Sequence, residues 1–210
     1  NEIREQYDLC GLSYALKNIH FPSSTEAAEA ARNRLAFDEL LTLQLGMSMM
    51  KTNSRRKTSC QMDDSKSIEK YIDTLPFELT EAQTNAVNEI IADLCRDVPM
   101  NRLLQGDVGS GKTAVAAAAC YFAFENGMQS ALMAPTEILA LQHYNTLSQF
   151  LEPLGVNVCL LTGSLTPKKK NAVKEKIASG EVNVVVGTHA IIQSDTIFQK
   201  LGLVITDEQH

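Results

Sequence analysis

A run of eight residues near the middle of the sequence has the composition of a phosphate-binding loop. It reads GDVGSGKT and matches the pattern GxxxxGK[ST] at every fixed position. The glycines let successive backbone N–H groups face one centre, and the positive end of a following helix attracts a polyphosphate. We expect Lys112 to lie on the β and γ phosphates and the Thr113 hydroxyl to bind Mg²⁺, which prefers oxygen ligands. The residues of the expected loop are Gly106, Asp107, Val108, Gly109, Ser110, Gly111, Lys112 and Thr113.

Two adjacent carboxylates follow the last apolar stretch of the sequence. Asp207 and Glu208 come close behind Leu201–Ile205, a stretch that has the composition of a buried strand. Ligands of open α/β sheets bind at the carboxyl ends of the strands. A carboxylate there can hold Mg²⁺ through its water shell, and a second one can orient or deprotonate the attacking water. We therefore expect Asp207 to bind the metal and Glu208 to act on the water, with Lys112 as the third catalytic residue.

The elements that must position these residues begin at Phe77. From there on, short apolar runs alternate with helical stretches, which predicts an α/β fold with a parallel sheet flanked by helices. The expected strands are 102–105, 130–134, 157–161, 183–187 and 203–207, and the expected helices are 112–125, 138–150, 168–178 and a shorter one near Ile191. In this arrangement the phosphate loop joins the first strand to its helix, and Asp207 ends the fifth strand.

Residues 1 to about 75 have a different sequence pattern, without glycine-rich turns or strand-like apolar runs. We expect them to be helical. Ser23 and Glu26 have the spacing of a capping box, and an amphipathic helix of roughly 25 residues should follow. Its apolar positions are Ala27, Ala31, Leu35, Leu41, Leu45 and Met49. Residues 51–70 are polar and nearly free of core residues, which predicts a linker or an exposed insertion.

The composition excludes several classes of protein. With 210 residues, 44% hydrophobic and 21% charged, the chain is neither disordered nor collagen-like. The longest strongly apolar run, 114–124, is too short for a membrane helix, which needs about 20 residues. The formal net charge of −6 argues against a surface that binds nucleic acid everywhere, but it leaves a local basic groove open. Five cysteines without a CxxC pair favour reduced thiols in a cytoplasmic compartment.

Several stretches in the second part of the chain resemble a known family. The phosphate loop and the sequence DEQH at 207–210 are similar to those of the superfamily 2 helicases. The sequence around them resembles the RecG family of ATP-dependent DNA helicases. The similar stretches are LPFELTEAQ at 75–83, residues 100–113, APTEILA at 134–140, QHY at 142–144, GTHA at 187–190 and DEQH at 207–210. This resemblance implies a RecA-like P-loop NTPase lobe in 76–210, ending after the DEQH box, and a helical connector that follows a wedge domain in 1–75.

The resemblance also assigns an adenine site to two residues of the stretch before the phosphate loop. In the family, an aromatic ring at the position of Phe77 packs on the base, and an amide at the position of Gln83 reads its edge. Gln83 has a second interpretation, because Thr80 and Gln83 also have the spacing of a capping box for a helix running to Leu94. Both roles can hold together.

Further positions match the nucleic-acid side of such motors. The resemblance implies that Pro135, Thr136 and Glu137, together with Thr188 and His189, face the DNA backbone. Hydroxyls, imidazole and helix N-termini contact phosphates without reading sequence, as a translocating motor requires; the alternative is that these residues are only turn and cap residues. Residues 162–164 are weaker candidates for the same groove. The family uses the positions of Gln209 and His210 to link the nucleotide site to the DNA side.

The activity implied by the resemblance is ATP-dependent remodelling of replication forks and Holliday junctions in recombination and repair. ATP and Mg²⁺ are the implied cofactors, DNA is the implied partner, and no membrane is involved. The chain begins at Asn1 rather than Met and stops after an acidic cluster, so we expect a piece that lacks the wedge domain and the second RecA-like lobe. Such a piece should bind Mg-ATP weakly, hydrolyse it poorly and unwind nothing.

Other functions compete with this interpretation. A transcription-repair coupling translocase and a primosomal helicase share much of the pattern, usually with a DEEH-type ending. Another P-loop NTPase, such as a transporter or a switch GTPase, is disfavoured because the guanine-specific N/TKxD motif is absent. A nucleotide-binding adaptor without catalysis is disfavoured by the intact Lys112, Thr113, Asp207 and Glu208.

Overall fold

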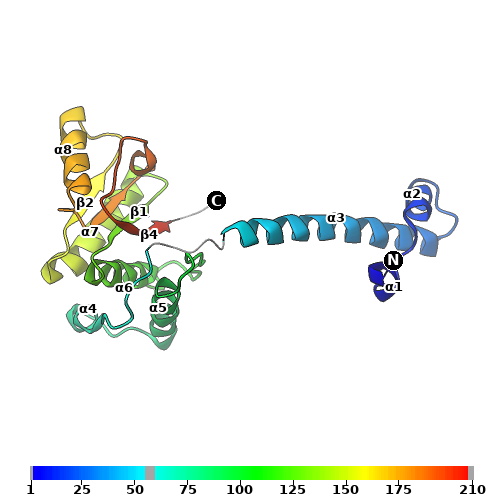
Figure 1. The fold of residues 1–210 in the computed structure, drawn as a ribbon, viewed down its shortest axis with the longest axis horizontal. Coiled ribbons are helices and arrows are strands. Elements are labelled where there is room, and N and C mark those ends of the chain that lie inside the picture. Colours follow the sequence, from blue (N-terminus) through cyan, green and yellow to red (C-terminus); the bar gives the residue numbers. More distant parts are fainter. Residues whose placement is uncertain (1, 55–59, 208–210) are drawn as a thin grey trace. The chain divides into compact units, whose positions relative to one another are not determined.

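The computed structural model of the chain describes residues 2–54 and 60–207. The chain divides into two compact units, Asn1–Arg56 and Lys57–His210 (Figure 1). We expected the boundary near residue 75, whereas the contacts place it after Arg56. The expected roles of Glu208, Gln209 and His210 lie outside the described residues.

The first unit is helical, as expected. It consists of α1 Glu2–Gln6, α2 Leu12–His20 and α3 Thr25–Ser54. Helix α2 packs on the start of α3, where Ala15, Ala27 and Ala31 are buried because small side chains allow close helix contact. Farther along α3, Leu45 and Met49 are exposed within this unit, so only the first part of the expected apolar face is covered.

The residue that caps α3 differs from the expected one. The side chain of Ser24 accepts a hydrogen bond from the backbone N–H of Ala27 at 3.2 Å, as an N-cap residue does. Ser23 instead donates from its N–H and its hydroxyl to Asn18 Oδ1, at 3.1 and 3.0 Å. The capping-box prediction therefore placed the helix start one residue too early, because Ser23 is used to tie α2 to the turn.

The described part of the expected linker, residues 60–70, is anchored in the core of the second unit at two positions. Met62 and Ile68 are buried in its main hydrophobic cluster, and the backbone N–H of Met62 donates to Leu94 O at 3.2 Å. Tyr71 of α4 (Glu69–Thr74) is also buried, and its hydroxyl donates to Ala114 O at 2.8 Å. Two apolar side chains thus anchor this segment to the unit, whereas residues 63–67 between them are exposed, as in an exposed insertion.

The second unit is built on a four-stranded parallel sheet in the order β2-β3-β1-β4. The strands are β1 Gln129–Met133, β2 Val158–Leu161, β3 Val184–Gly187 and β4 Leu201–Thr206. Met133 pairs with Gly187 and with Thr206, and Gly187 pairs with Leu161, so the carboxyl ends of all the strands meet at one edge. This sheet confirms the expected α/β class and every expected strand except 102–105.

Helices cover both faces of this sheet (Figure 1). Besides α4 they are α5 Glu81–Leu94, α6 Lys112–Glu125, α7 Glu137–Leu151 and α8 Pro167–Ala178, with two 3₁₀ helices, η1 Glu152–Leu154 and η2 His189–Ile192. Side chains alternate between the faces of a strand. Val184 and Val186 therefore join the cluster that contains α6 and α7, whereas Val185 joins a second cluster with Ile177 of α8.

The segment 102–105 is not a strand. Arg102 pairs with Asp93 of α5 at 2.8 Å and also with Glu89, while Leu103 is 81% exposed. Among the described residues, β4 pairs only with β1, and 102–105 lies in no strand pairing. A strand exists through its backbone hydrogen bonds to a neighbour, so an apolar segment without a partner stays irregular.

Two further expectations concern membrane-spanning helices and the state of the cysteine thiols. In the described part of the chain, no helix combines the length and apolar character that a membrane crossing demands. Burial raises the pKa of the Cys120 and Cys159 thiols to about 12, so these two cysteines stay protonated at neutral pH. Neither thiol is therefore a candidate nucleophile.

Candidate functional site

The phosphate loop has a backbone that only glycine adopts easily. Gly109 and Gly111 have φ values of +82° and +79°, in the left-handed region. Gly111 is the N-cap of α6, which begins at Lys112. A Cβ at Gly111 would also collide with the side-chain amide of Gln83. These glycines bring the loop into the first turn of α6, as the phosphate-loop prediction requires.

The side chain of Lys112 folds over its own loop. Its Nζ donates to Gly106 O at 2.7 Å and to Asp107 O at 2.8 Å. The ammonium group is therefore held by the carbonyl oxygens of the first two residues of the loop. An anion that approached the loop would meet this charge together with the first N–H groups of α6.

Gln83 connects the helix before the loop with the loop itself. The capping box at the start of α5 is present: Thr80 Oγ1 accepts from Gln83 N at 3.3 Å, and Gln83 Oε1 accepts from Thr80 N at 2.8 Å. The other end of the Gln83 amide, Nε2, donates to Ser110 O at 2.8 Å. The capping interpretation is thus confirmed, and a contact between Gln83 and a base stays a prediction.

Phe77 lines an open hollow beside α5. The hollow has a volume of about 630 Å³, within the range of small-molecule sites. Its lining residues are Ile72, Asp73, Leu75, Pro76, Phe77, Glu78, Leu79 and Thr84. The ring of Phe77 is 44% exposed and packs edge-on against Phe150, with the centroids 6.2 Å apart. An exposed aromatic ring in a mainly apolar hollow is a suitable surface for a flat base.

Asp207 lies at the carboxyl end of β4 and is held from two sides. Its backbone N–H donates to Met133 O at 2.9 Å, which extends the pairing with β1. Its side-chain Oδ2 lies 2.6 Å from Nε2 of His143, on α7. His143 was not assigned a role from the sequence, although it stands in the stretch QHY that resembles the family. A contact 64 positions apart leaves no local signal in a sequence.

The topology brings the phosphate loop to the same edge of the sheet as Asp207. Helix α6 ends at Glu125, β1 begins at Gln129, and α6 packs on both β1 and β4. Because so short a connection reverses the chain direction, α6 runs antiparallel to the strands. Its 14 residues rise about 21 Å, against about 17 Å for the five residues of β1. The start of α6, including Thr113, therefore lies level with the carboxyl ends of the strands.

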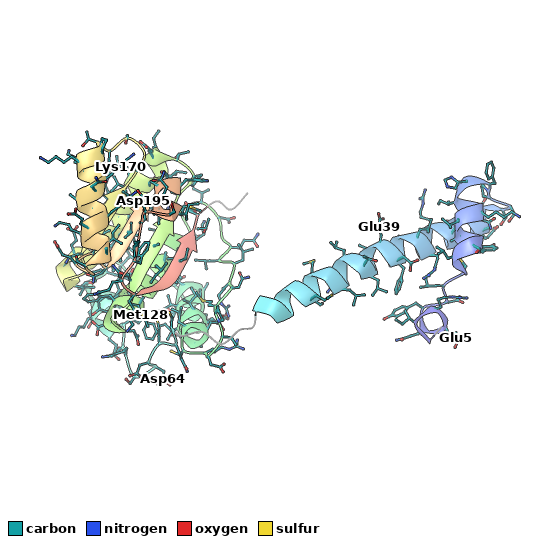
Figure 2. All side chains as sticks on the ribbon, turned by 45° about the horizontal axis from the view of Figure 1, so that its top comes forward. Glu5, Glu39, Asp64, Met128, Lys170 and Asp195 are labelled. Atoms are coloured by element: carbon teal, nitrogen blue, oxygen red, sulfur yellow. The ribbon has the colours of Figure 1, made fainter. Side chains whose placement is uncertain are left out.

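The loops after β1 and β2 are joined by a carboxylate. Thr136 is the N-cap of α7, with Oγ1 accepting from Leu139 N at 3.3 Å, which confirms a capping role. Glu137 Oε1 accepts from Ser164 N at 2.8 Å, and the hydrogen bonds from Ser164 lower the pKa of Glu137. Lys170, in the first turn of α8 (Figure 2), donates to Gly163 O at 2.7 Å. The segment 162–164 is thus fixed to two helices.

The remaining predicted DNA residues lie at the same edge. Pro135 follows β1 and is exposed, Thr188 follows β3 and is the N-cap of η2, and His189 is exposed. None of these three residues is among the buried residues of the core. The structure therefore brings together the ends of all the strands, with hydroxyl, imidazole and backbone groups along one edge.

The described residues contain no group of three or more His, Cys, Asp or Glu side chains arranged to hold a metal ion. A site formed by one hydroxyl, one carboxylate and a polyphosphate is of a different kind, because Mg²⁺ keeps several of its waters there. The donors predicted for Mg²⁺, Thr113 and Asp207, are hard oxygen ligands that suit this ion.

Comparisons with known proteins identify the family of the chain. Residues 80–210 match the DEAD/DEAH box helicase family. Over 100% of its length the chain is 47% identical to the ATP-dependent DNA helicase RecG of Synechocystis and 46% identical to that of Bacillus subtilis, and it covers 25% and 31% of those proteins.

Solved structures are similar as well. A RecG bound to a three-way DNA junction has a TM-score of 0.88 and 44% identity, covering 100% of this chain and 29% of that chain. A hypothetical ATP-dependent RNA helicase from Sulfolobus tokodaii shares the fold, with a TM-score of 0.51 and 24% identity over 67% of this chain and 40% of that chain. The chain spans between a quarter and a third of the RecG proteins it matches. It belongs to the DEAD/DEAH box helicase family, and over the whole of its own length it is similar to the RecG members of that family.

Proposed function

We propose that the chain is the first motor lobe of an ATP-dependent DNA helicase that remodels branched DNA, such as forks and Holliday junctions. The observation that carries this proposal is the run of α6 from the phosphate loop back to β1, which implies that the loop lies near the carboxyl end of β4, where Asp207 stands. The carboxyl edge of the sheet is the ligand-binding edge of open α/β folds. Identity of 46–47% to RecG proteins over the whole of this chain favours this function over a transcription-repair coupling translocase, a primosomal helicase or an unrelated P-loop NTPase.

In this proposal the nucleotide is bound mainly by the phosphate loop. The Nζ of Lys112 exchanges its bonds with the carbonyls of Gly106 and Asp107 for the β and γ phosphates. The N–H groups of the loop and of the first turn of α6 donate to phosphate oxygens. Phe77 packs on the adenine, and Gln83 either reads its edge or holds the loop through Ser110, as it does here.

The residues at the edge also suit a magnesium ion. The Thr113 hydroxyl and one oxygen of Asp207 would hold it, the latter partly through water. When bound, Mg²⁺ neutralises charge on the β and γ phosphates. Glu208, the next residue of the chain, is proposed to orient the attacking water and accept its proton.

The DNA side is proposed to lie along the loops that follow the strands. Thr136, Thr188 and His189 present groups that contact phosphates without reading bases. Glu137 has a different proposed role from the one expected, because its carboxylate is engaged with Ser164 and would repel a phosphate. We propose that Glu137 shapes this surface, and that Gln209 and His210 couple it to the nucleotide.

The chain is proposed to work as one part of a larger motor. Residues from about 60 onward form the first RecA-like lobe, because Met62, Ile68 and Tyr71 are buried in its core, and residues 2–54 form a connector from a wedge domain that binds the junction. A second lobe would supply an arginine to the transferring phosphoryl group, a contribution of about 10³ to 10⁵ in rate in related enzymes. We further propose a cytoplasmic location, where DNA is available and thiols stay reduced.

Equilibrium binding of a fluorescent ATP analogue to the 210-residue chain tests the proposal, with Lys112→Ala as the variant. We expect weak binding by the wild type and loss of that binding in the variant, because the loop loses its only side-chain cation. Asn145→Ala, an exposed position of α7, serves as the control. Equal affinity of wild type and Lys112→Ala would contradict the site, and strong DNA-stimulated hydrolysis by the chain alone would contradict the need for a second lobe.

A further inference from the structure

The contact between α7 and the end of β4 carries a role that the proposed site leaves unassigned. We propose that His143 is a positioning residue that orients the Asp207 carboxylate for hydrated Mg²⁺. The inference rests on the proposed function, since it concerns the same metal. It adds a residue that does not touch the nucleotide or the metal and acts only through Asp207.

The geometry of the pair supports a directed hydrogen bond. His143 Nε2 lies 2.6 Å from Asp207 Oδ2, and the two side chains are 17% and 31% exposed. An ionised carboxylate can only accept hydrogen bonds, so the imidazole must donate from Nε2. This bond engages Oδ2 and leaves Oδ1 as the oxygen that can receive a water of the metal. The imidazole therefore selects which way the carboxylate faces.

The imidazole is itself held firmly. Helix α7 is anchored in the main core by Ala140, Leu147 and Leu151, each 0% exposed. It packs on β2, on β3 and on α6, the helix that starts at the phosphate loop. His143 thus belongs to a rigid element that contacts the loop's own helix, and it transmits that position to Asp207. Asp207 directly follows the last residue of β4, and His143 is the hydrogen-bond partner that the described residues give its carboxylate.

The alternative is that the pair only fastens α7 to the sheet. The two roles differ in what they predict for metal binding. Partners that orient a metal-binding carboxylate typically change metal affinity by about 10 to 100-fold when they are removed. A fastening role would change stability and leave the metal dependence of nucleotide binding alone.

The experiment is a Mg²⁺ titration of fluorescent ATP-analogue binding by the 210-residue chain. His143→Leu removes the donor and keeps an apolar side chain of similar size, whereas His143→Gln offers an amide N–H near the position of Nε2. We expect His143→Leu to raise the Mg²⁺ concentration at half-maximal binding about tenfold, with nucleotide affinity in EDTA unchanged. His143→Gln and the control Asn145→Ala should stay near the wild type.

A double variant tests whether the effect passes through Asp207. With Asp207→Ala already in place, adding His143→Leu should cause no further change in the Mg²⁺ dependence, because the residues act as one unit. Circular dichroism checks that each variant is folded. If His143→Leu does not fold, His143→Asn takes its place, because its amide is too short to reach Asp207.

The outcomes separate this inference from the proposed function. Wild-type Mg²⁺ dependence in a folded His143→Leu protein, together with loss of binding in Lys112→Ala, would overturn the role of His143 and leave the nucleotide site standing. An equal loss of affinity with and without Mg²⁺ would also overturn it, in favour of the fastening role. Wild-type protein that binds nucleotide without any Mg²⁺ dependence, or not at all, would overturn the proposed site and this inference together.

Discussion

The phosphate loop and the carboxyl end of β4 differ in what holds them in place. The loop depends largely on its neighbours in sequence: two left-handed glycines set its course, and Lys112 bonds to carbonyls five and six residues earlier. One hydrogen bond comes from farther away, from Gln83 Nε2 to Ser110 O. Asp207 depends on distant parts of the chain, through its backbone bond to Met133 and its side-chain bond to His143, 64 residues away. One side of the proposed site is therefore defined locally, and the other by packing.

This difference has a functional consequence. Local contacts survive when the core is loosened, whereas contacts between distant residues require α7, β1 and β4 to keep their places. Changes in the loop should therefore alter the nucleotide affinity measured without Mg²⁺. Changes in the packing of α7, β1 and β4 should alter the Mg²⁺ dependence of nucleotide binding. Variants of the core and of the loop can therefore separate the two sides.

The largest effect is expected from the core of α7. Leu147 is 0% exposed, and Leu147→Ala should lower the free energy of unfolding by about 2–5 kcal/mol, because it leaves a cavity under the helix that carries His143. Leu141→Ala, at a position 48% exposed on the same helix, is the matched control and should cost much less. Urea denaturation measures both. Similar losses for the two variants would show that α7 is not packed as described.

A smaller effect is expected from the loop. Gly111→Ala should cost about 1–2 kcal/mol of stability, since alanine is strained at a positive φ, and its Cβ would displace the Gln83 amide and weaken nucleotide binding. Gly127 also has a positive φ, +65°, but open space around it, so Gly127→Ala is the control. Gly127→Ala should lower the stability and leave the nucleotide affinity unchanged. Calorimetry and nucleotide titration report the two quantities, and equal affinities of the two variants would break the proposed link between this glycine and the site.

The smallest effect concerns Glu137. Hydrogen bonds from Ser164 lower the pKa of this carboxyl below its usual 4.5, so its stabilising effect is complete above that pH and is lost as the pH falls through the lowered value. We expect wild type to be more stable than Glu137→Ala at pH 7 and expect this difference to shrink by pH 3. Denaturant curves at both values test the sign. A difference that grows on acidification would contradict the hydrogen bonds to the carboxylate.

The sequence predicted the locally defined features well. The bounds of α6, the capping box of α5 and four strands of the sheet follow from glycine placement, from Thr80 and Gln83, and from apolar runs. These signals lie within a few residues of the structure that they specify, so a single sequence contains them in full.

Features that depend on distant partners were missed or wrongly placed. The apolar segment 102–105 looks like a strand, but strand formation needs a neighbour that no local pattern identifies. Met62 and Ile68 sit in a polar stretch and are nevertheless core residues, because α5 and the sheet provide the surface that covers them. His143 was overlooked for the same reason, since its partner Asp207 becomes its neighbour only in the folded unit.

The most direct test of the account is a crystal structure of the chain with Mg²⁺ and a non-hydrolysable ATP analogue. We predict one metal ion in contact with the Thr113 hydroxyl at about 2.1 Å, and linked to Asp207 directly or through one water, with the phosphates across the loop. A nucleotide bound elsewhere, or Thr113 and Asp207 too far apart to share one hydrated ion, would contradict the claim that the two regions form a single site.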